Sequence, residues 1–155
     1  MIRYLSPSSI KMFQESPEGF YKRYIAPVRE IREPQTLPMS VGSAFDAYAK
    51  SNLYKDLFGK REERFEFDKL FESQVEIQNR DWANKAGFHA FSEYRDCGAY
   101  SDLLLQLNRA QSEPQFEISI EGKVSAPDLG IEGIPFLGKP DLYFIGESGH
   151  TVILD

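Results

Sequence analysis

Residues 138–155 constrain the fold of this chain most, because they have the pattern of a β-hairpin. Two short apolar runs, 142–145 and 151–154, are rich in residues that favour strands. The segment between them begins Gly-Glu-Ser-Gly and holds residues that are typical of a chain reversal. The sequence therefore predicts two antiparallel strands joined by a turn.

The predicted hairpin carries an acid on each arm. If Ile145 pairs with Thr151 across a five-residue turn, Asp141 falls opposite Asp155. Opposed Cβ atoms in an antiparallel pair lie about 4.5–5.5 Å apart, so the two carboxylates repel each other. A shared proton, a cation from elsewhere in the chain or a divalent metal would offset this repulsion, and oxygen ligands suit Mg²⁺ or Mn²⁺. A turn shorter by one residue would instead place the acids on opposite faces, and the sequence leaves both turns open.

The two acids also resemble a known motif. Pro140-Asp141, followed fourteen residues later by Asp155 at the end of an apolar strand, resembles the PD-(D/E)XK nuclease superfamily, especially its RecB-like and phage exonuclease branches. Segments 6–24, 42–46 and 116–123 agree, so the resemblance covers nearly the whole chain. The family motif continues to a lysine two residues after the second acid, beyond residue 155. We therefore expect an incomplete nuclease domain that cleaves weakly or not at all.

The resemblance implies an α/β (α+β) fold with a restriction-endonuclease-like core. We expect one domain spanning 1–155, with several N-terminal helices, then a three-strand antiparallel meander, and a further helix and strand beyond residue 155. The pattern of the chain agrees, because residues 116–121 alternate between apolar and polar side chains as a half-buried strand does. Segment 131–137 then leads into the strand that bears Asp141, and the hairpin completes the meander.

Helices are expected before this sheet. Ser6-Pro7 and Ser16-Pro17 each combine a capping residue with a proline at the first helical position, and predict two short helices. The apolar spacing predicts further helices over 41–58, 68–85 and 88–111.

Asp46, on the helix that starts at residue 41, is a candidate metal ligand. It lies one turn after Gly42, and the two resemble a G-x-x-x-His/Glu helix motif of RecB-like and phage exonucleases, with Asp in the last position. Glycine would let another backbone or a metal approach Asp46, which would bind the metal directly or through water. The alternative is an ordinary ion pair with Lys50 at i+4. Beside Asp141 and Asp155, we favour the metal site.

The resemblance implies hydrolysis of phosphodiester bonds by metal-activated water, as a DNA exonuclease in phage or bacterial recombination, repair or processing. Asp141 and Asp155 would be catalytic, and with Asp46 would bind one or two Mg²⁺ or Mn²⁺ ions. Glu121, on the polar face of the first strand, is a further candidate to support the metal, and Glu117 on the same face is a weaker one.

The charge distribution bears on nucleic-acid binding. The net charge of −6 argues against a non-specific coat protein, because phosphate binding calls for a basic surface. Residues 1–32 nevertheless carry six Lys or Arg and three Glu, a balance of +3 that leaves −9 for residues 33–155. The candidates for contact with DNA are Lys11, Lys22, Arg23 and Lys139, and Lys123 flanks the same sheet as Lys139.

The competing hypothesis is a catalytically inactive domain that binds nucleic acid or protein. Its acids would be structural, and Tyr21 and Tyr24 would stack on bases. The binding charges would be Lys11, Lys22, Arg23, Arg29 and Arg32. A metal hydrolase with other substrates is a third hypothesis. The sequence does not distinguish DNA from RNA or exonuclease from endonuclease action.

The single cysteine excludes an internal disulfide and the four thiolates of an iron–sulfur cluster. Ser16 stands where cluster-containing RecB-like proteins have a cysteine, so we expect no such cluster. No apolar run is long enough to cross a membrane, and the N-terminal residues do not show the basic segment followed by an apolar core that is typical of a signal sequence. We expect a soluble cytoplasmic protein, in the host cytoplasm if it is phage-encoded. Its partners would be DNA, including single-stranded DNA, and a helicase or annealing protein, without a membrane.

Overall fold

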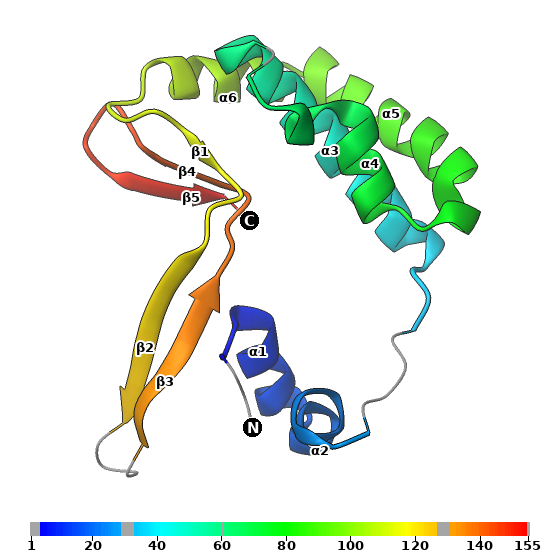
Figure 1. The fold of residues 1–155 in the computed structure, drawn as a ribbon. Helices are drawn as coiled ribbons and strands as arrows, with labels where there is room; N and C mark the ends of the chain where they lie inside the picture. The colour runs from blue at the N-terminus through cyan, green and yellow to red at the C-terminus, as the bar shows by residue number, and fades with distance from the viewer. Residues whose placement is uncertain (1–3, 29–32, 60, 127–130, 155) are drawn as a thin grey trace. The chain divides into compact units, whose positions relative to one another are not determined.

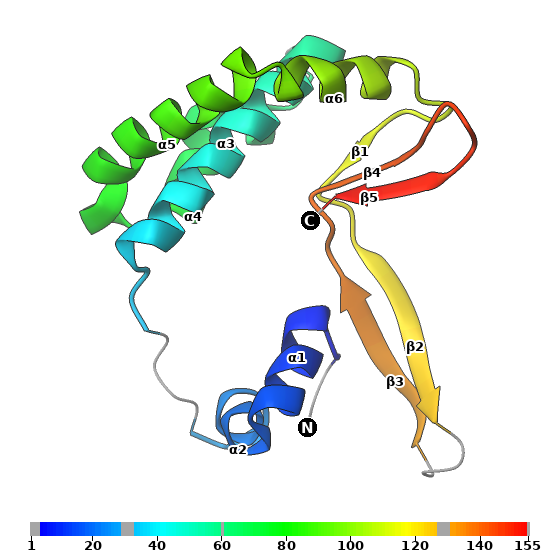
Figure 2. The same ribbon diagram turned by 180° about the vertical axis from the view of Figure 1, so that it is seen from behind.

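A computed structural model describes residues 4–28, 33–59, 61–126 and 131–154. They belong to two compact units, which we call the sheet unit (residues 1–32 and 110–155) and the helical unit (residues 33–109). Helices and antiparallel strands are both present, as Figures 1 and 2 show, so the predicted α+β class is confirmed. That the two units make one domain stays a prediction. Among the described residues, no helix is both long and apolar enough to cross a membrane.

The described part of the helical unit contains the helices α3 (Leu37–Phe58), α4 (Phe67–Gln74), α5 (Arg80–Asp96) and α6 (Ala99–Asn108), with 3₁₀ turns at Glu63–Phe65 and Ile77–Asn79. Helix α3 ends at Phe58, as predicted, and Gly59 follows with a φ of 69°. Its predicted start at Val41 is wrong by one turn. The side chain of Thr36 accepts a hydrogen bond from the Met39 amide and begins the helix earlier.

The two helices expected over 68–85 and 88–111 are also wrong in their boundaries. The structure divides this region into α4, α5 and α6. After α4, Val75 takes an extended conformation and buries its side chain, while the Arg80 guanidinium binds the Val75 carbonyl at 3.2 Å. Gly98 has a left-handed φ of 87°, which glycine adopts at little cost, and it separates α5 from α6.

Close packing of α3 against α5 builds the core of the helical unit. Ala44 and Ala47 on α3 and Ala83 on α5 are fully buried. A side-chain carbon added to Gly87 would lie 2.5 Å from the Ala44 Cβ, so the absence of a side chain there lets the two helices approach. Aromatic rings pack beside this contact, and Phe91 lies edge-on to both Phe45 and Tyr100.

Two short helices open the sheet unit. These are α1 (Pro7–Glu15) and α2 (Pro17–Phe20), followed directly by a π-helical turn, Tyr21–Ile25. The predicted caps are confirmed, because Ser6 accepts a hydrogen bond from the Ser9 amide and Ser16 accepts one from the Gly19 amide. Leu5 then ties the start of α1 to the sheet through hydrogen bonds with the backbone of residues 135 and 137.

The strands of the sheet unit are β1 (Gln115–Phe116), β2 (Ile120–Ala126), β3 (Ile131–Gly138), β4 (Leu142–Ile145) and β5 (Thr151–Leu154). Strand β4 lies between β1 and β5, and β2 pairs with β3, all antiparallel. The chain order is that of the predicted meander, but each of its first two strands is interrupted. The pairs Phe116↔Leu142 and Ile120↔Gly138 keep one register across the break. A single long ladder is therefore broken at 117–119 and 139–141.

The contact at Gly87 predicts opposite effects for two glycine substitutions. Gly87→Ala should lower the free energy of unfolding by about 1–3 kcal/mol, because the added methyl group meets Ala44. Gly42→Ala is the matched control on α3. An added carbon there meets no heavy atom within 4 Å, so the better helix propensity of alanine should raise the free energy by up to about 1 kcal/mol. Urea unfolding measures both, and equal effects would contradict the packing described.

Tyr100 predicts how stability responds to alkali. Burial, followed by a 2.6 Å hydrogen bond that its hydroxyl donates to Asp56, raises the pKa of Tyr100 above its ordinary value of 10.0. The folded chain therefore holds this proton more tightly than the unfolded chain, and the stabilisation is present below pH 10 and lost as the pH rises further. In Tyr100→Phe, the fall in unfolding free energy between about pH 9 and pH 11 should be shallower. An unchanged slope would contradict this assignment.

Candidate functional site

The C-terminal hairpin has the register that the sequence predicts for a five-residue turn. Ile145 pairs with Thr151 and Leu142 with Leu154. The turn is closed by a 2.8 Å hydrogen bond from the Gly146 amide to the His150 carbonyl. The five-residue turn is thereby confirmed and the shorter turn is excluded. Asp155, which this register would pair with residue 141, lies outside the described residues.

On its other side, Asp141 faces a second acid. The Glu117 amide donates a 3.0 Å hydrogen bond to the Asp141 carbonyl, one step beyond the pair Phe116↔Leu142. A carboxylate oxygen of Glu117 lies within 4.8 Å of one from Asp141. Glu117 is exposed and Asp141 is partly buried. The sheet unit thus brings together two hard oxygen donors of the kind that Mg²⁺ and Mn²⁺ prefer.

The structure favours Glu117 over Glu121 as the carboxylate beside Asp141. Glu121 is exposed and pairs with Leu137 on the separate β2–β3 ladder. It follows Glu117 by four residues, which span at most about 14 Å of chain. The alternation in the sequence places both glutamates on one face but does not give their partners. The register with β4 would have identified Glu117, and that register depends on the turn between β2 and β3.

The backbone at Glu117 supports a special role for this residue. Its φ is 48°, in the left-handed region that residues other than glycine, asparagine and aspartate seldom adopt. Such a conformation costs about 1 kcal/mol or more and persists where the surroundings enforce it. Here it coincides with the break in the ladder and with the hydrogen bond to Asp141. The folded chain is therefore less stable, by the conformational free energy of this residue, than it would be with an ordinary backbone at the position of this carboxylate.

Strand β4, which immediately follows Asp141, is firmly anchored. Leu142 and Phe144 point into the core and are 4 % and 1 % exposed. At the far end, the Ile145 amide donates to the Ser112 hydroxyl at 2.9 Å, and the Ile145 carbonyl accepts from the Gln111 amide at 2.8 Å. The backbone that carries the acid is thus held at both ends of the strand.

Asp46 belongs to the helical unit and is engaged in an ion pair there. Its Oδ2 atom lies 2.8 Å from the Lys50 ammonium group and accepts a 2.9 Å hydrogen bond from the Gln74 amide nitrogen. The Lys50 side chain is 7 % exposed and that of Asp46 is 31 % exposed. The ion pair considered from the sequence is therefore present. A role for Asp46 in binding metal together with Asp141 stays a prediction.

A polar network positions the Asp46 partner Gln74. The side-chain amide of Gln35 donates to the Ser43 hydroxyl and to the Gln74 carbonyl, and its oxygen accepts from the Glu76 amide. The Gln74 side chain is then fixed by its bond to Asp46, while its own oxygen is buried without a hydrogen-bond partner among the described residues.

No other group packs closely against Gly42, one turn before Asp46, since a side-chain carbon added there would meet no heavy atom within 4 Å.

Two of the predicted DNA-binding lysines are already paired with acids. Lys11 lies 3.9 Å from Glu15, and Lys22 lies 2.7 Å from Glu18, where it also lowers the pKa of that glutamate by a hydrogen bond and its charge. Both pairs are on the surface, where such bridges contribute little to stability. They reduce the net positive charge that these helices present. Arg29 and Arg32 lie outside the described residues.

The remaining predicted contacts are exposed. Arg23 lies on the π-helical turn, and Lys139 lies between β3 and β4, two residues before Asp141. Tyr21 is 52 % exposed and available for stacking, whereas Tyr24 packs against Phe20 with ring centroids 5.1 Å apart. The charge nearest Asp141 in the chain is thus Lys139.

No family model, curated protein or solved structure matches this chain. The resemblance to PD-(D/E)XK nucleases therefore stays an expectation from the sequence. Within the sheet unit, the structure brings Glu117 and Asp141 together and sets Glu121 apart from them.

The Asp46–Lys50 pair predicts a stability effect that must be separated from any effect on metal binding. Asp46→Asn leaves the buried Lys50 ammonium group facing a neutral amide, so the free energy of unfolding should fall by about 1–3 kcal/mol in metal-free buffer. Adding Lys50→Met should restore most of this loss. Urea unfolding in the presence of a chelator is the measurement, and an Asp46→Asn protein as stable as wild type would contradict a structural role.

Proposed function

We propose that the protein is a divalent-metal-dependent nuclease that hydrolyses DNA, with the restriction-endonuclease-like core of the PD-(D/E)XK superfamily. One observation carries the proposal: the pairing of β4 with β1 brings the Glu117 carboxylate beside that of Asp141. The hydrogen bond to the Glu117 amide fixes the neighbour on the β1 side. Continuing the β4–β5 register by one residue would give Asp155 as the neighbour on the other side.

Carboxylates gathered at one place on a sheet suit a divalent cation, because each of them offers hard oxygen ligands. Oxygen ligands in this number suit Mg²⁺ or Mn²⁺ far better than zinc, whose sites in proteins favour histidine and cysteine. The acids therefore favour a metal centre over a purely structural role.

The family resemblance supports the same conclusion from other parts of the chain. The motif Pro140-Asp141 comes directly before a buried strand, as it does in the family, and the second acid is Asp155. The paired N-terminal helices have the expected serine caps. By this resemblance, Asp46 would be a further ligand, which adds a carboxylate from a helix.

A bound Mg²⁺ or Mn²⁺ ion would activate water and polarise the scissile phosphate. The residues of the protein would hold the metal ion and orient the substrate. The anchored strand β4 fixes the Asp141 backbone, and the Glu117 carboxylate supplies a neighbouring donor. The negative charge of a phosphate bound there would be offset by the positive charge of the exposed Lys139, which precedes Asp141 by two residues.

Manganese binding tests the proposal without requiring turnover. Wild-type protein should bind Mn²⁺ in calorimetry or by electron paramagnetic resonance, and Asp141→Asn should weaken this binding at least about tenfold, by roughly 1.4 kcal/mol. Glu117→Gln should also weaken it. Glu121→Gln is the matched control from the same strand region and should leave the affinity unchanged.

Cleavage assays with Mg²⁺ or Mn²⁺ on single- and double-stranded DNA complete the test. Any turnover should disappear in Asp141→Ala and persist in Glu121→Gln. Two results would contradict the proposal: equal Mn²⁺ affinity in wild type and Asp141→Asn, or equal losses in Asp141→Asn and Glu121→Gln. DNA binding that persists without metal dependence would instead favour the inactive binding domain.

A further inference from the structure

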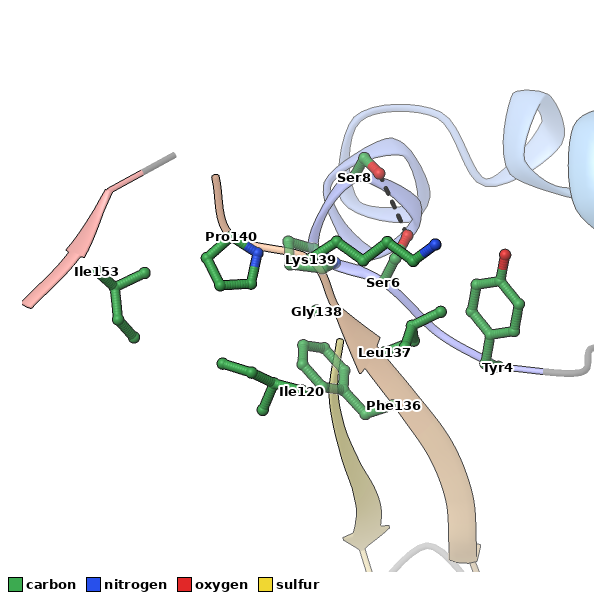
Figure 3. A pocket seen from close by; sticks show the side chains of 11 residues that line it. Tyr4, Ser6, Ser8, Ile120, Phe136, Leu137, Gly138, Lys139, Pro140 and Ile153 are labelled. Carbon is green, nitrogen blue, oxygen red and sulfur yellow. Dashed lines mark hydrogen bonds between the residues drawn. The ribbon is translucent and has the colours of Figure 1, made fainter. Parts of the chain in front are cut away.

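A cavity of about 730 Å³ opens in the sheet unit beside the candidate metal site, and Figure 3 shows it from close by. Its apolar wall includes Ile120, Phe136 and Ile153. Polar atoms reach it from Tyr4, Ser8 and Lys139. This size and this mixture, with a mostly apolar wall and a few polar groups, are typical of pockets that bind small organic ligands.

The charge around the cavity favours an anion. None of the Asp and Glu residues that the structure describes lines this cavity, and the charged residue among its described lining is Lys139. Figure 3 shows the Lys139 side chain extending along the cavity from Pro140 toward Tyr4. Within the described part of the chain, its ammonium group has no ion-pair or hydrogen-bond partner. A ligand that brings a negative charge would supply one.

The start of α1 contributes less than Lys139. Two of the amides at its start are already bound, because the Ser6 and Ser9 hydroxyl groups each accept a hydrogen bond from the backbone amide of the other residue. The Ser8 hydroxyl lies 3.2 Å from that of Ser6 and can still donate or accept. The selectivity for an anion therefore comes from the lysine, and the hydroxyl groups suit a ligand with several polar edges.

We propose that this cavity binds one nucleotide of a DNA strand, with the base against Phe136 and Ile120 and the phosphate at Lys139. An aromatic ring accepts any base by stacking, and an apolar wall removes the base from water. The inference rests on the proposed nuclease function, since it gives the DNA strand a place next to the metal site. Lys139 and Asp141 are two residues apart, so their Cα atoms lie at most about 7 Å apart and the proposed nucleotide would lie in the same part of the sheet unit as the acids.

The test uses thymidine 5′-monophosphate as the probe, in a chelating buffer so that no metal contributes. Wild-type protein should bind it in calorimetry or NMR titration. Lys139→Met should weaken binding about tenfold, because the phosphate loses a charged hydrogen-bond donor, and should leave binding of thymidine, which lacks the phosphate, unchanged. Phe136→Leu keeps the wall apolar but removes the ring, and should weaken the binding of both compounds.

Lys123→Met is the matched control. Lys123 is an exposed lysine on β2 in the same unit, and it does not line the cavity. This variant should bind the nucleotide like wild type. The test is also separable from the proposed function, because Lys139→Met should keep its Mn²⁺ affinity and Asp141→Asn should keep its nucleotide affinity. If wild-type protein binds Mn²⁺ but not the nucleotide, the nucleotide site fails. If it binds the nucleotide but not Mn²⁺, the proposed metal-dependent function fails.

Two outcomes would overturn the nucleotide site. One is absence of thymidine monophosphate binding, or equal binding in Lys139→Met and wild type. The other is self-association through the cavity, in which wild-type protein sediments as a dimer, Ile153→Asp sediments as a monomer, and neither binds the nucleotide. Ile153 is 55 % exposed, which makes this variant informative without disturbing a buried core.

Discussion

The antiparallel pairing of β4 with a neighbour on each side is the constraint on which the candidate site depends. Strand pairing fixes which residues lie opposite each other, and a shift of one residue would move every side chain to the other face. The buried side chains of Leu142 and Phe144 resist such a shift, because it would expose them. The same burial that stabilises the sheet unit therefore also sets Asp141 beside Glu117.

The helical unit depends on a different constraint, which is the close approach of α3 and α5. Small residues at Ala44, Ala47 and Gly87 permit this approach, and the ion pair of Asp46 with Lys50 lies on the same helix. An acid beside a buried lysine offsets part of the cost of burying its charge. Asp46 therefore has a structural function that holds whether or not it also binds a metal.

The sequence predicted the elements whose signals are local. The serine caps of α1 and α2, the end of α3 at Gly59 and the five-residue turn of the C-terminal hairpin each follow from a few neighbouring residues. The division of the region after Gly59 into α4, α5 and α6 was missed, because tertiary burial of Val75 and the conformation of Gly98 decide it. Glu117 was ranked below Glu121 for a related reason: alternation along one strand does not reveal the register with the next. The role of Asp155 and the joint role of Asp46 stay predictions.

The left-handed backbone at Glu117 has a consequence for how this sequence would vary under selection. Glycine or asparagine would occupy a φ of 48° more easily than glutamate. A library of variants selected only for folding should therefore lose the glutamate early, whereas one selected for an activity that needs the carboxylate should retain it. Whether glutamate is kept at position 117 therefore distinguishes selection for folding alone from selection for an activity that needs the carboxylate.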